Sequence, residues 1–257
     1  MIDLVQMSPE VDSAPSKRGW LEHGTHIAVH SHRQGQLLYA STGVLATTTE
    51  LGTWVAPADR LTWTPPGFAH SHRIYGETDC RVVNVPRELC DSLPSRPTVF
   101  AVTPLLREAL VALTTDRTFR PGARERLRQV MIDELTDSPE QVLYLPAPQD
   151  DRLRAATDLL HADPGNTATL AELGRSVGAS ERTLSRLFHA ELGMSFHQWR
   201  TLLRVQHALV HLLDGHPVTS TALACGWSNP TSFIEAFTAI VGQTPGRYQN
   251  DLRRAAP

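Results

Sequence analysis

The 257-residue sequence predicts an α+β chain, with a β-barrel in its N-terminal half and an all-α domain in its C-terminal half. Three observations support this prediction. Residues 20–90 contain short Thr-, Val- and Trp-rich segments separated by Gly and Pro, which is typical of a barrel or sandwich of short strands. A Pro-rich stretch over residues 145–150 lacks apolar periodicity and marks a domain boundary. Beyond Asp151 only helical spacing of apolar residues occurs, and an approximate duplication is present.

The strands with the clearest pattern are Gln36–Ser41, Thr53–Ala56 and Arg81–Val85. Pro and Gly residues between them indicate turns, at Pro57, Pro65-Pro66-Gly67 and Gly76. We expect the aromatic residues of this region to pack in the interior, namely Tyr39, Trp54 and Trp63. Residues 1–100 are therefore assigned to the barrel.

Two helices are predicted after the barrel, over residues 104–116 and 121–136. Thr103 is a capping residue and Pro104 suits the first helical position. The apolar faces comprise Leu106, Leu110 and Leu113 in the first helix, and Leu127, Val130, Met131 and Leu135 in the second. Such faces can pair two subunits, so we expect residues 101–144 to form a dimerisation segment of a homodimer. A linker at 145–152 and a helical domain at 153–257 follow.

Composition restricts the location of the chain. No apolar run approaches the roughly 18 residues that a bilayer span requires. Residues 1–16 lack the pattern of a signal peptide and are expected to form a short polar arm. The three cysteines contain no CxxC pair, which argues against a disulfide framework or a thiolate zinc site. We expect a cytoplasmic protein that does not associate with membranes.

Net charge does not by itself indicate a nucleic-acid partner, because the whole chain carries −3. Residues 151–257 contain ten Arg and nine Asp or Glu, a balance of +1. A nearly neutral domain binds DNA only when its cations lie on one face. Evidence for DNA binding must therefore come from the pattern of residues.

The first half of the duplication spans Leu170–Phe188. A short apolar helix ends at Gly178-Ala179-Ser180, where Gly permits the positive φ of a tight turn and Ser can cap the next helix. The apolar face of this next helix comprises Leu184, Leu187, Phe188 and Leu192. Its outward positions carry the side-chain types that contact base edges and phosphates in a major groove, namely Arg182, Thr183, Ser185 and Arg186.

The second half spans Val218–Val241 and repeats this arrangement. Gly226 lies 48 positions after Gly178, and Asn229-Pro230 begins a helix that buries Phe233, Phe237 and Val241. The short helix before the break carries Val218, Ala222 and Leu223. The outward residues include Thr231, Ser232 and Glu235. A long amphipathic helix that contains Phe196, Trp199, Leu203, Val210 and Leu213 joins the two halves and would fix the separation of two groove-reading helices.

The stretch from Asp151 to Tyr248 resembles the DNA-binding domain of AraC/XylS-type regulators over its whole length. The most specific part is Gly226-Trp227-Ser228-Asn229-Pro230-Thr231-Ser232-Phe233, followed by Phe237 and by Gly242-Gln243-Thr244-Pro245-Gly246-Arg247-Tyr248. The first half, Leu170–Leu173 through Arg182–Phe188, also matches. The chain departs from the family at Thr238 and Ala239, where basic residues are common. We expect contacts to double-stranded DNA from Arg182, Arg186 and Ser232 first, then from Thr183, Ser185, Asn229 and Thr231.

A histidine cluster is predicted in the barrel. His30 and His32 would point to the same side of a strand, and the turn at Pro65–Gly67 could bring His70 beside them, with His72 following. The spacings resemble both motifs of the cupin barrel, although Gln36 stands where the usual Glu ligand would be and Ile74 replaces the usual Asn. The resemblance implies a cupin-like barrel and one divalent ion, Zn, Ni or Fe, bound by His30, His32, His70 and Gln36.

Two interpretations of this cluster remain open: a regulatory or structural metal site, and a metal-free pocket in which His30, His32, Gln36, His70 and His72 bind a small-molecule effector. In both cases the expected function is control of transcription by a DNA-binding regulator that is not an enzyme, with RNA polymerase as a candidate partner. The alternatives are a metal-dependent cupin enzyme with a helical appendage, and a helical protein-interaction module that does not bind DNA.

Overall fold

The computed structural model describes residues 16–140 and 143–255. The polar arm expected over residues 1–16 lies outside them, except for Ser16. The chain divides into two compact units. Of the described residues, the β unit comprises 16–50, 54–140, 143–144 and 255, and the helical unit comprises 51–53 and 145–254. The expected α+β organisation is confirmed.

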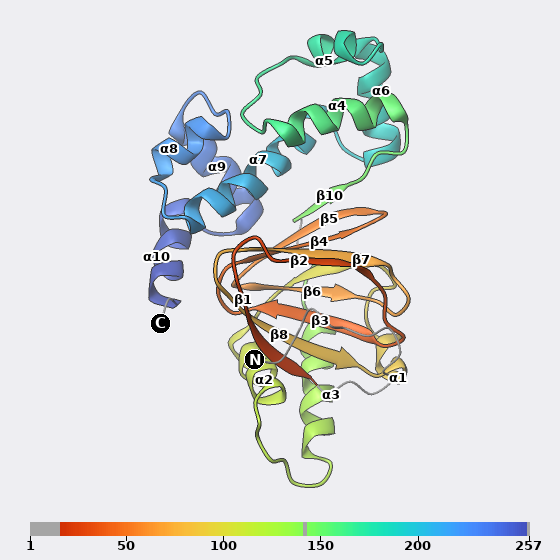
Figure 1. Ribbon diagram of the computed structural model, residues 1–257, viewed down its shortest axis with the longest axis vertical. Coiled ribbons are helices and arrows are strands. Elements are labelled where there is room, and N and C mark those ends of the chain that lie inside the picture. Colours follow the sequence, from red (N-terminus) through yellow and green to blue (C-terminus); the bar gives the residue numbers. More distant parts are fainter. Residues whose placement is uncertain (1–15, 141–142, 256–257) are drawn as a thin grey trace. The chain divides into compact units, whose positions relative to one another are not determined.

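Two five-stranded antiparallel sheets form the β unit (Figure 1). Sheet A has the order β1-β8-β3-β6-β9 and sheet B the order β10-β5-β4-β7-β2. Sheet A contains β1 (Lys17–Leu21), β8 (Thr78–Val85), β3 (Gly35–Ala40), β6 (Arg60–Thr64) and β9 (Thr98–Ala101). Sheet B contains β10 (Tyr144–Pro146), β5 (Gly52–Pro57), β4 (Val44–Thr49), β7 (His70–Tyr75) and β2 (His26–His30). The three strands predicted from the sequence correspond to β3, β5 and β8.

Alternate side chains of β3 contribute to two different cores. Leu37 and Tyr39 belong to a cluster that includes Trp63, while Leu38 and Ala40 belong to a cluster with residues of β4 and β7. This alternation follows from the two-residue period of a strand. Gln36 has the parity of Leu38 and Ala40, so its side chain lies on the face of sheet A that packs toward sheet B. On that face the Gln36 side chain lies 2.9 Å from His32 Nε2.

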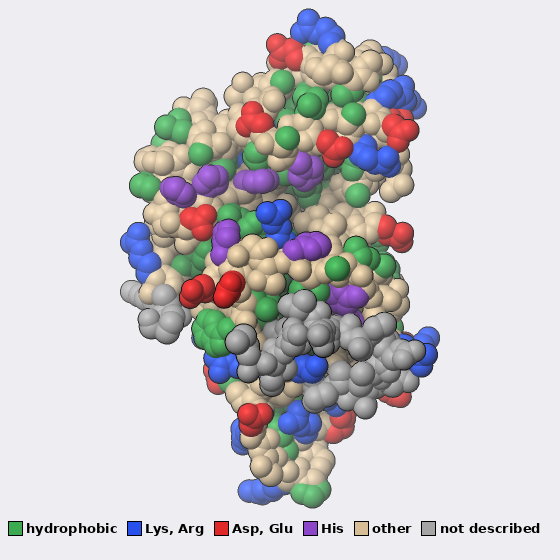
Figure 2. Space-filling model, in the orientation of Figure 1, with side chains coloured by type: hydrophobic (Ala, Val, Ile, Leu, Met, Phe, Trp, Pro, Cys, Tyr) green, Lys and Arg blue, Asp and Glu red, His purple; other side chains and the backbone are tan. Residues whose placement is uncertain are grey.

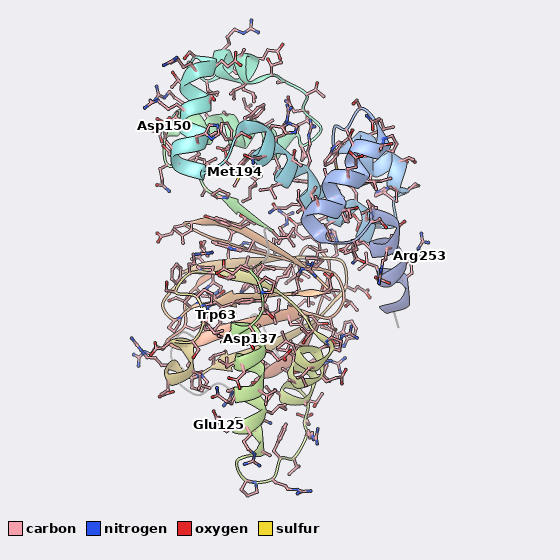
Figure 3. All side chains as sticks on the ribbon, turned by 180° about the vertical axis from the view of Figure 1, so that it is seen from behind. Trp63, Glu125, Asp137, Asp150, Met194 and Arg253 are labelled. Atoms are coloured by element: carbon pink, nitrogen blue, oxygen red, sulfur yellow. The ribbon has the colours of Figure 1, made fainter. Side chains whose placement is uncertain are left out.

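Helices α2 (Pro104–Thr114) and α3 (Ala123–Thr136) cover the other face of sheet A, and a short α1 (Arg87–Cys90) precedes them. Thr103 caps α2 as expected, since its side chain accepts a hydrogen bond from Leu106 N. The apolar faces of α2 and α3 join the cluster around Trp63, which Figure 3 shows between the sheet and α3. The faces expected to pair two subunits are thus covered by the chain's own sheet.

Two details of this helix pair differ from the prediction. Helix α3 begins at Ala123, after Gly122 at φ +71°, rather than at Pro121. Val130 was predicted in its apolar face but is 39% exposed, whereas Met131 and Leu135 are buried. The face of a helix covered by one flat sheet is narrow, and Val130 lies outside it.

The helical unit contains α4 (Asp151–Ala162), α5 (Leu170–Ser176), α6 (Glu181–Leu192), α7 (Phe196–Leu213), α8 (Val218–Ala224), α9 (Pro230–Val241) and α10 (Pro245–Ala255). The segment expected as a linker, residues 145–152, contains the end of β10 and the start of α4. Asp150 caps α4 by accepting hydrogen bonds from Arg152 N and Leu153 N. Among the helices of the described residues, none is both long and apolar enough to cross a membrane.

Candidate nucleic-acid interface and histidine site

The first helix-turn-helix pair consists of α5 and α6. The turn between them contains Gly178 at φ +69°, a conformation that side chains with a Cβ rarely adopt. Ser180 then caps α6, because its hydroxyl accepts a hydrogen bond from Thr183 N at 3.1 Å. Leu184 and Phe188 are fully buried and hold α6 against α4 and α7. These local signals form a rigid helix whose N-terminal half faces outward.

On the outer face of α6, Arg182 and Arg186 are exposed and one turn apart, as predicted, and Ser185 beside them is half-buried. The Thr183 hydroxyl is 2.8 Å from the Ser180 hydroxyl, so this side chain takes part in the cap. His189 is exposed one further turn along the same face, and the sequence interpretation missed it. His189 follows Arg182 by seven residues, or about two helical turns, so this spacing could have placed it on the same face from the sequence.

The second pair consists of α8 and α9. Gly226 lies in the turn at φ +80°, and the Asn229 side chain caps α9 by accepting a hydrogen bond from Ser232 N at 2.8 Å. Phe233 and Phe237 are fully buried, while Thr231 and Ser232 are exposed. Asn229, predicted as a DNA contact, therefore also has a structural role at the helix terminus.

Leu223, one of the apolar residues of the predicted short helix, has a side chain that is 64% exposed in α8. Thr221 and Ala222 are the buried residues of this helix. A helix of seven residues offers only about two turns, so the choice of inward face depends on the neighbouring helices rather than on its own pattern.

Helix α7 runs between the two pairs (Figure 1). Figure 2 shows Arg side chains, interspersed with Asp and Glu, around the end of the helical unit that carries α5 and α6, whereas the end that carries α8 is largely uncharged on the visible face. Consistent with this, α9 contains one Glu and neither Lys nor Arg. The two groove-reading helices, which we call the reader helices, thus differ in charge.

The histidine site lies at one end of the β unit. Donor atoms of His30, His32 and His70 all lie within 4.8 Å of one another. His70 and His72 are buried on β7 with the inward parity of Ile74, and His30 ends β2. His32 lies beyond the end of β2, which corrects the expectation that it shares a strand with His30. An irregular register between Ile27 and His30 accompanies this strand end.

Backbone carbonyls orient two of the rings. Nδ1–H of His30 donates to Ala28 O, and Nδ1–H of His70 donates to Phe68 O, each at 2.7 Å. Carbonyl oxygens only accept, so in the neutral form of either ring Nε2 carries the lone pair. The buried Nε2 atoms of His30, His70 and His72 have no hydrogen-bond partner within the described part of the chain. Such an arrangement, in which one nitrogen is held by a carbonyl and the other is available, is typical of metal-binding histidines.

Burial keeps the rings of His32, His70 and His72 neutral near pH 7. Desolvation lowers the pKa of His32 to about 4, with His70 and His30 adding to the shift. Desolvation also lowers the pKa of His70 to about 4, although its hydrogen bond to the Phe68 carbonyl acts in the opposite direction. The pKa of His72 is well below its usual value, again chiefly because the ring is buried. Neutral imidazole is the form that binds a metal ion.

Two predicted members of the site have other partners. The Gln36 side-chain amide donates to His32 Nε2 at 2.9 Å, so it orients this ring. His72 lies next to His70, with 4.9 Å between ring centroids, and its Nδ1 is 3.0 Å from the hydroxyl of buried Thr47. Thr47 was not identified from the sequence, because nothing in a Thr-rich strand marks one hydroxyl.

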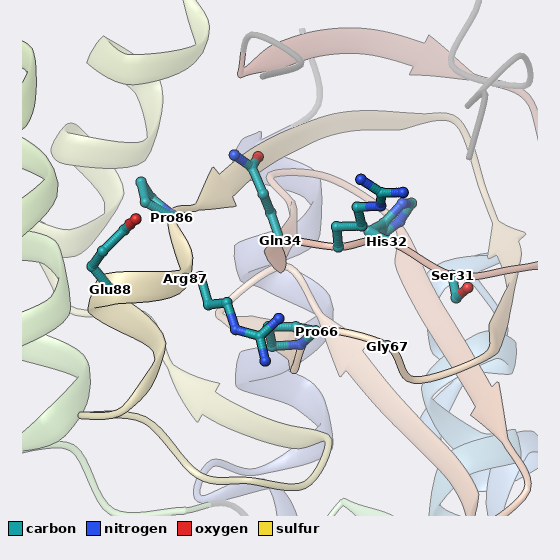
Figure 4. A pocket seen from close by; sticks show the side chains of 9 residues that line it. Ser31, His32, Gln34, Pro66, Gly67, Pro86, Arg87 and Glu88 are labelled. Carbon is teal, nitrogen blue, oxygen red and sulfur yellow. The ribbon is translucent and has the colours of Figure 1, made fainter. Parts of the chain in front are cut away.

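An open cavity of about 1040 Å³ adjoins the histidine site, and Figure 4 shows it. Residues 31–34, 66–67 and 86–88 line it, the last of these at the start of α1, and His32 is among them. Arg33 and Arg87 contribute positive charge and Glu88 negative charge. The cavity offers a ligand a route to His32.

Comparisons with known proteins bear on the helical unit first. Residues 173–251 match the model of the helix-turn-helix domain family. The regulator NimR of Escherichia coli, an HTH-type transcriptional regulator, is 34% identical over 233 residues, which cover 89% of this chain and 84% of NimR. A putative AraC-like transcription regulator of Streptomyces antibioticus is 29% identical over 63% of this chain and 58% of its own length.

Among solved structures, a DNA-binding transcriptional dual regulator from Escherichia coli K-12 aligns with 25% identity and a TM-score of 0.38, covering 42% of this chain and 97% of that chain. The extended similarity to NimR, the matched helix-turn-helix domain and the two pairs of helices agree with one another. The chain therefore belongs to the AraC-type family of helix-turn-helix transcription regulators.

Proposed function

We propose that this DNA-binding regulator responds to a divalent metal ion bound by His30, His32 and His70, with His72 close by. The observation that carries the proposal is that the buried Nε2 atoms of His30 and His70 have no hydrogen-bond partner among the described residues, because each such group costs roughly 1–3 kcal/mol when it is left unsatisfied. A metal ion bound by these two atoms would remove that cost, and the donor atom of His32 lies within 4.8 Å of the donor atoms of both residues. Imidazole donors suit Zn, Ni and Fe. Ion binding would shift the population of DNA-competent chains.

On the DNA, the proposal assigns Arg182, Arg186 and Ser185 of α6 to one major groove and Thr231 and Ser232 of α9 to the next. Thr183 and Asn229 contribute mainly by holding the N-termini of these helices. Two observations support this assignment. The opposite faces of both helices are buried, and the exposed side chains include Arg182, Arg186, Thr231 and Ser232. Successive major grooves on one face of a duplex lie roughly 34 Å apart, which two readers on one connecting helix can span.

The test of the metal proposal uses the full chain, stripped with a chelator and reloaded with Zn, Ni or Fe. We expect one ion per chain in the wild type and in His26→Ala, a control that removes an exposed histidine of the same strand β2. We expect almost none in His70→Ala. Metal removal should change the affinity for a duplex selected from random DNA by about tenfold, within the usual range of coupling between two sites.

An unchanged DNA-binding midpoint with and without metal would show that the ion is not the effector. In that case the cavity lined by residues 31–34 and 86–88 would be the site of a small-molecule effector, which is the second candidate. The enzyme alternative predicts oxygen uptake by the iron-loaded chain, and we expect none.

The homodimer remains part of the proposal, although α2 and α3 use their apolar faces within the chain. Leu105 of α2 and Val130 of α3 are still exposed and are candidates for a subunit contact. Sedimentation velocity with and without DNA tests this: a monomer under both conditions at working concentration would contradict it.

A further inference from the structure

A buried arginine lies at the middle of α7, between the two helix-turn-helix pairs. Arg204 is only 9% exposed. Its Nε donates to Pro164 O at 3.2 Å and its Nη2 donates to Asn166 O at 2.8 Å. Pro164 and Asn166 belong to the loop that leads from α4 into α5, so the guanidinium is fixed to the first pair.

The same guanidinium also contacts the second pair. It lies over the ring of Trp227, with 5.7 Å from Cζ to the ring centroid. Trp227 follows the turn between α8 and α9, and its ring packs against Phe233 of α9 at 4.9 Å between centroids. One side chain therefore joins the loop before the first pair to the turn inside the second.

Two glycines bring the backbones of these segments into direct contact. A Cβ on Gly165 would lie 2.8 Å from Ala224 O, closer than real Cβ atoms approach backbone oxygens. A Cβ on Gly226 would lie 2.7 Å from Gly165 O and 2.6 Å from Arg204 Nη2. The contact thus requires the absence of a side chain at both positions.

This contact gives the two pairs a second connection besides α7. Helix α7 has 18 residues and is about 27 Å long. Long helices are rarely straight, so α7 alone fixes the separation of the two readers less closely than α7 together with a second contact. A lateral contact at the middle of α7 restricts that motion.

We propose that Arg204, Gly165, Gly226 and Trp227 form a clasp that sets the separation of the two reader helices and thereby the spacing of the DNA sub-sites that one chain accepts. This inference rests on the proposed reading of two successive grooves. Arg204 is a positioning residue in this scheme and does not itself contact DNA.

The test measures binding of the full chain to a series of duplexes. An operator is first selected from random DNA, and the spacing between its two sub-sites is then changed by one or two base pairs in each direction. A further duplex contains only the sub-site read by α6. One base pair turns the second groove by about 35°, so we expect the wild type to lose about tenfold or more in affinity at each altered spacing.

Arg204→Met removes the guanidinium but keeps much of the apolar stem, and Gly165→Ala pushes the two backbones apart by a different route. For both variants we expect the preference for the native spacing to fall to about threefold or less, with affinity for the single sub-site unchanged. Arg200→Met is the matched control on the same helix, because Arg200 donates to Ala168 O and lies over Phe196, both on the side of the first pair. It should retain the wild-type spacing profile.

Circular dichroism melts of each variant separate positioning from unfolding. If the wild type prefers one sub-site spacing and both variants keep the same preference, the proposed role of the clasp is overturned. The proposal that one chain reads two grooves would still stand. Equal losses on the single sub-site and on every spacing would also overturn the clasp, because they would indicate a general structural role. A wild type indifferent to spacing would overturn the two-groove reading itself, and the clasp with it.

Discussion

Reader helices α6 and α9 share one construction but present different surfaces. Each follows a turn with a left-handed glycine, begins at a side-chain cap and ends at another left-handed glycine, Gly193 or Gly242. Their outward faces differ, because α6 carries Arg182 and Arg186 where α9, counted from its cap, carries Thr231 and Glu235. The buried residues and caps thus determine that a reader forms, while a few outward residues determine how it binds.

This difference implies a division of labour on DNA. Guanidinium groups bind phosphates and guanine edges strongly, so α6 should supply most of the affinity. Apolar and hydroxyl groups contact thymine methyl groups and base edges with little dependence on salt. We therefore expect α9 to discriminate among sequences more than it strengthens binding.

The largest expected effect tests whether the two helix-turn-helix pairs depend equally on their buried aromatic residues. Phe188→Ala in α6 and Phe237→Ala in α9 each truncate a fully buried ring. Each should lower the free energy of unfolding of the helical unit by about 3–5 kcal/mol, because both leave a cavity. Denaturant unfolding followed by circular dichroism measures this. A loss below about 1 kcal/mol in one variant alone would show that the two pairs are not equivalent in their packing.

The second test addresses the different surfaces. Arg186→Ala should weaken operator binding by about 1–3 kcal/mol, whereas Ser232→Ala, at the start of α9, should cost less. If Arg186 contacts a phosphate, the slope of log affinity against log salt should also fall by about 1. Fluorescence anisotropy at several salt concentrations measures both quantities.

Arg154→Ala is the matched control, since this exposed arginine of α4 lies outside both readers and pairs with Asp151. Equal losses for Arg186→Ala and Arg154→Ala would argue against a specific role for α6. A larger loss for Ser232→Ala than for Arg186→Ala would reverse the proposed division of labour.

The smallest expected effect tests whether the lack of positive charge on α9 is enough to explain its weaker contribution to DNA affinity. Ala239 is exposed on α9, one turn beyond Glu235 on the same face. Ala239→Lys should raise affinity by several-fold and steepen the salt slope by about 0.9, the value for one neutralised phosphate. Ala239→Gln controls for side-chain length. An unchanged salt slope in the lysine variant would place this part of α9 away from the DNA backbone.

The helical unit was more predictable from sequence than the β unit, for a physical reason. Caps such as Ser180 and Asn229 and turn glycines such as Gly178 act within a few residues, so the local sequence is enough to reveal them. Strand β7 has inward residues His70 and His72 in place of the expected apolar ones, and its partners β4 and β2 are distant in sequence. Its pattern therefore gave no strand signal.

The histidine site was predictable in part. Motif spacing was sufficient to place His30, His32 and His70 together. The hydrogen bonds that orient them were not, since the carbonyls of Ala28 and Phe68 become partners only once the strand ends have their final shape. Arg204 shows the same limit: within the pattern of α7 it looks like an ordinary polar residue, and only the fold brings Pro164 and Trp227 to it.

The tethering of the His30 and His70 rings to carbonyls two residues earlier has a dynamic consequence. Rings that are already held lose little rotational entropy when a ligand arrives, which favours tight binding. Each tether also links ring motion to the backbone at the end of β2 or the start of β7. Occupancy should therefore register as slower amide hydrogen exchange around residues 28–30 and 68–70, before any change reaches the rest of the sheet.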